Sequence, residues 1–172
     1  MALIVEDGSG KTDAESYVTL AEANIFWAAR NDAVWADAGD LEKEAALRAA
    51  TEYLDVAYVW KGVRVAVSQA LAWPRYGVVD RDGFAVDYDA VPDAVRTALN
   101  HLAHAALGED LLPAEDAASR IKRQREKVDV IETETEYAPG TSSRKRFPLV
   151  DRLVENLTRG RAAGLVGTQE RA

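Results

Sequence analysis

Apolar side chains recur at intervals of three and four residues in several stretches of the chain, which is the spacing of one buried helix face. The first stretch opens with a capping box, in which Thr19 and Glu22 satisfy each other's free backbone amides. A proline in the first turn and a glycine at the end mark the limits of another helix. The pattern predicts four helices, which begin near Thr19, Asp40, Pro92 and Phe147 and end near Arg30, Trp60, Gly108 and Leu157.

Two shorter patterns predict strands. Residues 77–86 read as a small hairpin, because an Asp-Gly turn at residues 80–83 separates two apolar stretches. Residues 128–137 alternate between glutamates and Ile or Thr, with the period of two that is typical of a strand. Val128 and Val130 fall on the glutamate face, so we expect a register slip or a bulge there.

The predicted fold is mainly α: a small helical bundle with a short β-hairpin, a strand-like arm and a C-terminal helix. We divide the chain into a helical core, residues 1–127, with the hairpin inserted near residues 77–86, and residues 128–172, an extended arm followed by a C-terminal docking helix. Within the core, residues 113–127 are expected to be helical only in part. An apolar share of 48% over 172 residues is enough for one hydrophobic core.

Charge is unevenly distributed along the chain, whose formal net charge is −8. Residues 1–119 hold 9 Lys/Arg and 21 Asp/Glu, whereas residues 120–172 hold 12 Lys/Arg and 8 Asp/Glu. An acidic body is a poor general binder of nucleic acid, because phosphate affinity comes mainly from Lys and Arg. An acidic body with a basic end instead favours contacts between unlike protein surfaces.

Two residue types restrict the chemistry. The absence of cysteine excludes a disulfide scaffold, a thiol nucleophile and cysteine-based metal sites. His101 and His104 are the only histidines, and no third histidine completes a metal site. No GxSxG elbow and no recognisable carboxylate pair is present. We therefore predict a protein that is not an enzyme and has no catalytic residues, cofactor or metal.

No apolar stretch approaches the length of about 18 residues that a membrane span needs.

Residues 8–12 (GSGKT) copy the end of the phosphate-binding loop GxxxxGK[ST], in which backbone amides cradle a phosphate. Val5 stands where that loop has its first glycine, and no βαβ unit follows. We interpret residues 8–12 as a flexible turn after a short strand.

Two basic clusters and one group of aromatic residues each allow two interpretations. Residues 120–127 and residues 144–147 form either solvated faces or contacts with a partner, which is an acidic protein surface or a phosphate backbone. The aromatic side chains of Trp60, Trp73 and Tyr76 either pin an irregular loop to the core or offer stacking platforms for single-stranded DNA. The acidic-to-neutral surroundings argue against stacking.

Several segments in order carry a family resemblance over residues 1–157. The most specific are residues 69–75 (QALAWPR) and the turn at residues 78–83 (VVDRDG); MALIVEDG, AESYV, TEYLD, WKG and RFP occur in matching places. The chain resembles short proteins of phage structural-gene clusters, the head–tail connector adaptors, also called head completion proteins. Sequences of this kind also carry a DnaT-like single-stranded-DNA-binding name.

The resemblance implies a structural virion protein of a tailed bacteriophage. Such adaptors form a homo-oligomeric ring, commonly a dodecamer, beneath the portal; the ring extends the DNA channel and links the capsid to the neck and tail. It implies that the protein is located in the virion neck after assembly in the host cytoplasm. The implied partners are the portal, neighbouring copies, the next neck or tail component, and DNA that passes without specific binding.

The resemblance also implies site residues. A C-terminal helix or tail of such adaptors docks on the portal, and the candidate portal-docking residues are Arg144, Lys145, Arg146, Phe147, Leu149, Leu153 and Leu157. The candidate intersubunit or structural residues are Trp73, Pro74, Arg75, Ile131 and Tyr137. The alternative function is that of a DnaT-like single-stranded-DNA-binding replication accessory protein, which would use residues 120–127 and exposed aromatic side chains in salt-sensitive binding.

Overall fold

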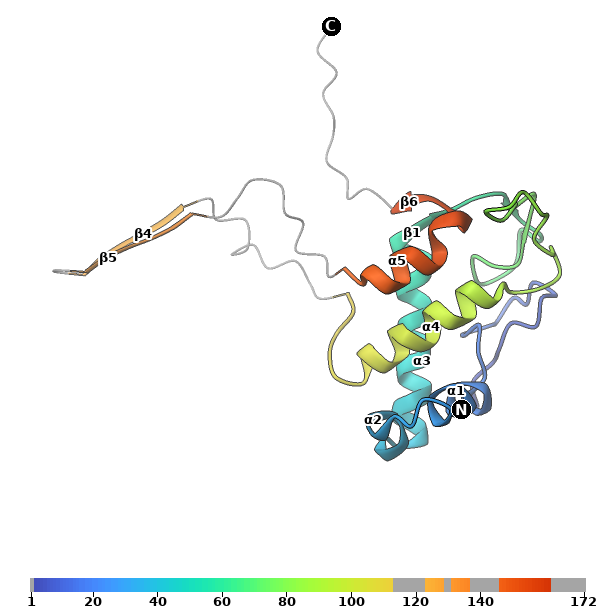
Figure 1. The fold of residues 1–172 in the computed structure, drawn as a ribbon, viewed down its shortest axis with the longest axis horizontal. Coiled ribbons are helices and arrows are strands. Elements are labelled where there is room, and N and C mark those ends of the chain that lie inside the picture. The colour runs from blue at the N-terminus through green and yellow to red at the C-terminus, as the bar shows by residue number, and fades with distance from the viewer. Residues whose placement is uncertain (1, 113–122, 129–130, 137–145, 162–172) are drawn as a thin grey trace, which may run out of the picture. The chain divides into compact units, whose positions relative to one another are not determined.

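The computed structural model describes residues 2–112, 123–128, 131–136 and 146–161. The chain forms two compact units: a helical unit, Met1–Leu111 with Phe147–Ala172, and a hairpin unit, Leu112–Arg146. The elements of the helical unit are α1 (Leu20–Ala28), α2 (Ala33–Asp37), α3 (Asp40–Ala57), β1 (Tyr58–Trp60), β2 (Val63–Arg64), β3 (Arg75–Tyr76), α4 (Asp93–Ala106), α5 (Pro148–Val154), a 3-10 turn (Glu155–Leu157) and β6 (Thr158–Arg161). The predicted mainly helical fold is confirmed (Figure 1).

The helix starts follow local capping signals. The Glu22 amide donates to the Thr19 hydroxyl at 3.1 Å and the Thr19 amide donates to the Glu22 carboxylate at 2.8 Å, which confirms the capping box. The helix α3 begins at Asp40 as predicted, and Gly39 is its N-cap residue. The short helix α2 was not predicted; Asp32 caps it by accepting a hydrogen bond from the Trp35 amide at 2.8 Å.

Three helices supply the core, in which α4 packs against both α3 and α5 (Figure 1). Apolar faces of α3 and α4 are buried, and the residues at 0% exposure on these two helices are Leu47, Ala50, Leu54, Val95, Ala98, Leu99, Leu102 and Ala103. Val150 and Val154 of α5 are buried in the same cluster. Burial of these side chains removes apolar surface from water and is the main stabilising contribution to the bundle.

The helix α3 ends at Ala57, three residues before the predicted end, because residues 58–60 form a strand instead. Strand β1 pairs antiparallel with β6, so that Trp60 lies opposite Thr158. This pairing and the packing of α5 place residues 147–161 in the helical unit. The sequence alone predicts that they belong with the arm, because their spacing along the chain gives no sign of a partner about 100 residues earlier.

The predicted hairpin at residues 77–86 is present as a tight turn with one antiparallel bridge, between Val79 and Ala85. The Asp80 amide donates to the Phe84 carbonyl oxygen at 2.8 Å, and the Asp80 carboxylate accepts from the amides of Asp82 and Phe84 at 2.9 Å. Aspartate at this position favours a turn because its carboxylate accepts a hydrogen bond from the backbone amide two residues further on.

The hairpin unit contains an antiparallel pair, β4 (Arg123–Val128) and β5 (Ile131–Glu136). The predicted strand is confirmed over residues 131–136. Val128 is the last residue of the preceding strand, so its place on the glutamate face of the predicted strand needs no bulge. Of residues 113–127, which were expected to be helical only in part, residues 123–127 form a strand. Residues 113–122 and Tyr137 lie outside the described residues.

Candidate nucleic-acid interface

The resemblance of residues 8–12 to a phosphate-binding loop has a structural explanation that does not involve a nucleotide. The buried Glu6 carboxylate accepts hydrogen bonds from the amides of Gly8 and Gly10, both at 2.9 Å, and of Lys11, at 2.8 Å. Successive backbone amides of this kind form an anion-binding nest. Because the chain's own carboxylate occupies the nest, residues 8–12 are an internally satisfied turn.

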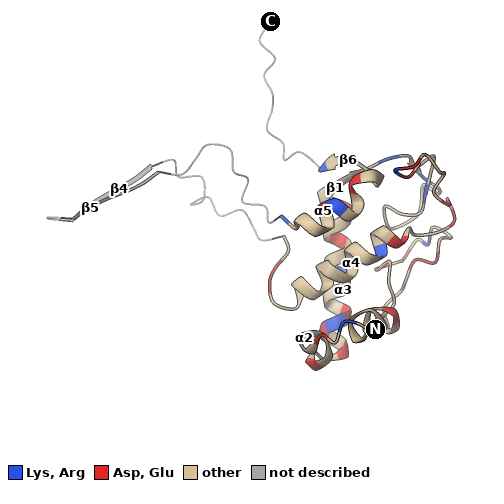
Figure 2. Ribbon diagram, viewed as in Figure 1, with Lys and Arg blue, Asp and Glu red and all other residues tan. Residues whose placement is uncertain are grey.

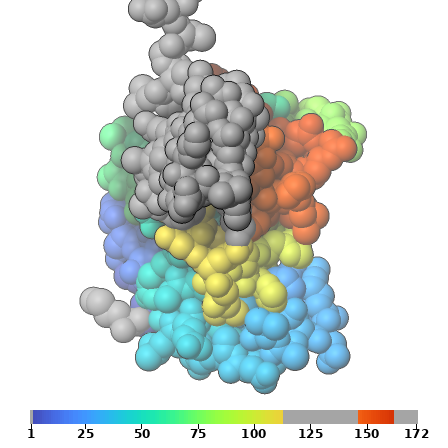
Figure 3. Space-filling view, turned by 90° about the vertical axis from the view of Figure 1, so that its left-hand side faces the viewer, coloured from blue at the N-terminus to red at the C-terminus, as the bar shows by residue number. Residues whose placement is uncertain are grey.

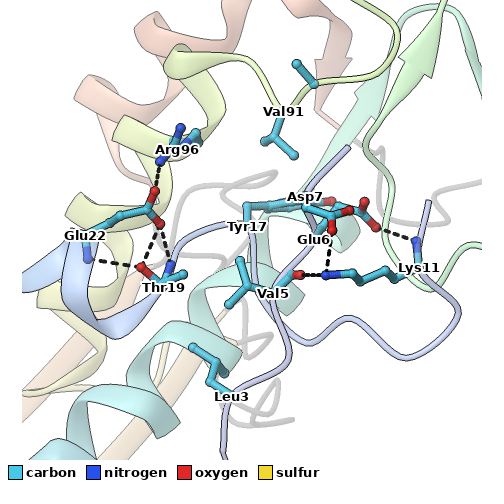
Figure 4. Close-up of a pocket in the computed structure, with 11 residues that line it drawn as sticks. Leu3, Val5, Glu6, Asp7, Lys11, Tyr17, Thr19, Glu22, Val91 and Arg96 are labelled. Atoms are coloured by element: carbon cyan, nitrogen blue, oxygen red, sulfur yellow. Dashed lines mark hydrogen bonds and ion pairs between the residues drawn. The ribbon is translucent and has the colours of Figure 1, made fainter. Parts of the chain in front are cut away.

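A cavity of about 490 Å³ lies beside this turn, and Figure 4 shows its charged groups paired with one another. The Lys11 ammonium donates to the Val5 carbonyl oxygen at 2.8 Å and lies 2.9 Å from the Asp7 carboxylate. On the other side Glu22 forms an ion pair with Arg96. Paired charges of this kind do not form the unlike, converging carboxylates that acid–base catalysis needs.

A second hollow, of about 490 Å³, is an aliphatic groove between α2, α3 and the end of α4. Figure 3 shows these elements meeting at one surface, with residues 33–37 in light blue, the start of α3 in cyan and the end of α4 in yellow. Its lining includes Val34, Ala45, Ala49, Ala106 and one carboxylate, that of Glu42. The groove therefore offers apolar surface and no catalytic group.

The two histidines pack against aromatic side chains of α1. The His104 ring lies 4.6 Å from the Trp27 ring between centroids, and its Nε2 lies 3.1 Å from the Asp32 carboxylate. His101 packs edge-on against Phe26, and burial lowers the pKa of His101. Among the described residues, no group of three potential ligands could hold a metal ion.

The QALAWPR segment, residues 69–75, braces the loop between α3 and α4. The Gln69 side chain is 3% exposed; it accepts from the Ala66 amide and donates to the carbonyl oxygens of Leu71 and Pro74. The Arg75 guanidinium donates to the carbonyl oxygens of Lys61, Gly62 and Ala72. Buried polar groups need such partners, so the most specific part of the family resemblance is explained by loop structure.

Asp55 and Tyr17 tie this loop to α3. The Asp55 carboxylate accepts from the Tyr17 hydroxyl at 2.6 Å and from the Ala72 amide at 2.9 Å, and the Trp73 amide donates to Tyr17. Burial raises the pKa of Asp55 to about 6, although these hydrogen bonds act in the opposite direction.

Asp55 is expected to make stability fall with pH. Its pKa is higher in the folded state than in the unfolded chain, so its contribution is complete below about pH 4 and is lost as the pH rises through about 6. Across that window wild type should lose up to about 3 kcal/mol relative to Asp55→Asn, whose side chain stays neutral. Urea unfolding of both proteins between pH 4 and 7 measures the difference. If the free energies of unfolding of wild type and Asp55→Asn change in parallel with pH, the prediction is contradicted. The matched control is Asp13→Asn, because the Asp13 side chain is exposed.

Four cations form what we call the basic cluster: Lys61, Arg64, Arg75 and Arg159. Burial lowers the pKa of Arg75, and the nearby charges of Arg64 and Arg159 lower it further. The Lys61 amide donates to the Leu157 carbonyl oxygen at 2.9 Å, which fixes Lys61 beside β6. Within the described part of the chain, none of the four forms an ion pair with a carboxylate. The cluster is therefore a group of neighbouring cations on an acidic body. The side chains of Lys61, Arg64 and Arg75 also donate to backbone carbonyl oxygens, and the Asp55 carboxylate lies near Arg64 and Arg75.

Exposed aromatic side chains adjoin the basic cluster. Tyr76 of β3 is 63% exposed, and its ring lies 6.0 Å from that of Tyr88, which is 58% exposed. Register places Val63 opposite Tyr76 and Arg64 opposite Arg75. Because side chains alternate along a strand, Val63 and Tyr76 lie on one face of this two-stranded ribbon, and Arg64 and Arg75 lie on the other face. We call the basic cluster together with Val63, Tyr76 and Tyr88 the Tyr76 surface. Figure 2 shows blue and red residues in these loops and blue at β6.

The structure separates the aromatic residues that the sequence analysis treated together. Trp60 and Trp73 are 6% and 0% exposed and pack edge-on against each other, so they pin the loop as one interpretation held. The interpretation as a loop anchor does not fit Tyr76, which is exposed, and stacking on this ring stays a prediction. Pro74 is buried beside Trp73, and Arg75 serves the loop backbone.

The candidate portal-docking residues have different surroundings. Leu157 is 5% exposed, Leu153 packs partly against the core, and the Phe147 ring lies 5.4 Å from that of Tyr53. These three side chains are used by the chain's own core, whereas Arg146 and Leu149 are exposed. Arg144 and Lys145 lie outside the described residues. Ile131 is the first residue of β5.

The basic run at residues 120–127 coincides with β4 from Arg123 onward. Register places Arg125 opposite Glu134 and Lys127 opposite Glu132. Opposite charges at facing positions favour strand pairing, so each basic position of this part of the run has a glutamate position opposite it in the register.

The fold and the Tyr76 surface define a small helical protein with a basic and aromatic patch. None of the helices that the structure describes has the length and apolar character of a membrane-crossing helix. The family model described as "Putative DnaT-like ssDNA binding protein" matches residues 1–172, and the chain belongs to this family. No curated protein and no solved structure matches the chain.

Proposed function

We propose that the chain binds single-stranded DNA through the Tyr76 surface. The observation that carries the proposal is the basic cluster: four cations that have no carboxylate ion pair in the described part of the chain, beside two exposed tyrosines. Single-strand binders combine a basic track for the phosphates with aromatic rings on which bases stack. Membership of a family with a DnaT-like description supports the same function.

The charge balance sets the expected strength. Because the whole chain has a net charge of −8, binding should be in the micromolar range that is typical of electrostatic, sequence-independent contacts. About three phosphate contacts to a single strand give a salt slope of about −2, so affinity should fall about tenfold between roughly 50 and 200 mM salt. Fluorescence anisotropy with a labelled oligothymidine measures this. Flat titration curves at low salt would refute the proposal.

Tyr76→Ala should weaken oligonucleotide binding about tenfold, since one base–aromatic stack contributes roughly 1–3 kcal/mol. The side chain is 63% exposed, so the fold should be retained. Tyr76→Phe is the matched control because it keeps the ring and should bind as wild type does. If Tyr76→Phe and Tyr76→Ala bind equally well, stacking on this ring has no part in binding.

A second candidate function is that of a head–tail connector adaptor of a tailed phage. The hairpin unit favours it, because its two strands form a compact unit of their own with edges that a strand of another protein can pair with. The acidic body favours it too, since a channel wall that repels phosphate lets DNA pass. Mixing the purified protein with its portal protein and imaging the complex tests it: a ring beneath the portal is expected, and a bare portal would count against it.

A further inference from the structure

The two strands of the hairpin unit differ in charge. Strand β4 carries three basic residues and one acidic residue, and β5 carries three glutamates and no basic residue. Register opposes each basic position of β4 to a glutamate of β5, in the pairs Arg123–Glu136, Arg125–Glu134 and Lys127–Glu132. The hairpin thus consists of one basic strand and one acidic strand.

Each strand has one neighbour in the described part of the chain, because β4 and β5 form a two-stranded sheet. An isolated two-stranded hairpin is marginally stable in water, and three or more strands are usually needed. The residues between the charges, among them Thr133 and Thr135, favour strand structure. The open edges of β4 and β5 therefore have unpaired backbone groups that a further strand would satisfy.

We propose that the hairpin unit joins copies of this chain edge to edge, with β5 of one copy paired antiparallel to β4 of the next. Repeating the internal register across this junction places every glutamate position of β5 between two basic positions. Pairing of β4 with β4 or of β5 with β5 opposes like charges and is disfavoured. The second copy is selected by charge complementarity, and this proposal does not depend on DNA binding.

The geometry of the junction has a consequence for assembly. Because β5 of one copy meets β4 of the next, the contact is heterologous and leaves one free edge at each end. Such contacts build a closed ring when the rotation between copies closes, and an open chain when it does not. Self-association should therefore proceed beyond a dimer, and it should weaken with salt, because salt screens the attraction between unlike charges.

The test uses the full chain and measures sedimentation velocity over a wide range of concentration at low and high salt. A basic-hairpin variant carries Glu132→Lys, Glu134→Lys and Glu136→Lys; an acidic-hairpin variant carries Arg123→Glu, Arg125→Glu and Lys127→Glu. An exchange variant carries both sets and keeps the net charge of −8. We expect the first two to lose self-association at least about tenfold, a mixture of them to regain it, and the exchange variant to associate as wild type does.

Wild type that stays monomeric at every concentration would overturn the proposal, and so would a basic-hairpin variant that associates as wild type does. Thermal unfolding followed by circular dichroism tests whether the helical unit stays folded in each variant, since the hairpin is a separate unit. Oligonucleotide affinity, measured below the association range, reports on the Tyr76 surface. The two variants change the net charge in opposite directions, so a loss of self-association in both, with oligonucleotide affinity that rises in one and falls in the other, separates this proposal from that of DNA binding.

Discussion

Replacement of Trp73 by alanine is expected to lower the free energy of unfolding by about 3–5 kcal/mol. The Trp73 side chain is fully buried, and its ring lies 5.7 Å from that of Trp60. Alanine would leave a large cavity in a core that cannot collapse to fill it. Urea or thermal unfolding measures the change.

Trp73→Phe is the matched control for this prediction. Phenylalanine keeps an aromatic ring in the core, and no hydrogen bond is lost, because the indole nitrogen has no partner among the described residues. We expect it to cost about half as much as alanine or less. If the free energy of unfolding of Trp73→Ala lies within about 1 kcal/mol of the wild-type value, the loop between α3 and α4 does not depend on this side chain.

The double variant Arg64→Glu/Arg159→Glu is expected to weaken single-stranded-DNA binding by about a hundredfold at low salt. Each substitution removes a cation that is available to a phosphate and adds a repelling carboxylate. Both residues are exposed and lie close enough to Arg75 to lower its pKa. The salt slope should become shallower as well, because fewer counterions are released. Anisotropy titrations at several salt concentrations measure both effects.

Arg30→Glu/Arg152→Glu makes the same change in net charge elsewhere. Arg30 follows α1 and Arg152 lies on α5, and both are exposed. This control should weaken binding only slightly, through the general field of the protein. Equal losses in the two double variants would mean that net charge, and not the basic cluster, governs binding.

Much of the fold could be predicted from local patterns. The capping box at Thr19, the apolar stripes of α3 and α4, and the proline before α4 are signals contained within one or two turns of helix. The short helix α2 has too few residues for a periodic stripe, although Asp32 is a cap signal. The pairing of β1 with β6 depends on residues about 100 positions apart, and periodicity carries no information on such partners.

The hairpin unit shows a signal that sequence reasoning missed. Arg123, Arg125 and Lys127 alternate with the period of two that the glutamates of β5 share. Reading the basic run only as a charged face hid its strand pattern. Contact of residues 120–127 with nucleic acid stays a prediction beside that of the Tyr76 surface.

The Tyr76 surface itself could not be predicted. Residues 61, 64, 75 and 159 are scattered along the chain, and the β2–β3 and β1–β6 pairings bring them together. Local patterns do not distinguish Tyr76 from Trp73, since both lie in the same irregular segment. Only the register and burial of the folded chain place one ring in solvent and the other in the core.

Photo-crosslinking of the full chain to an oligothymidine, followed by mass spectrometry of the adducts, tests the central claim most directly. Zero-length crosslinks form where a base contacts a side chain, so adducts should map to Tyr76 or Tyr88, and they should disappear in Arg64→Glu/Arg159→Glu. Adducts confined to β4 and β5, or oligonucleotide binding that leaves no adduct on either tyrosine, would contradict DNA binding at this surface.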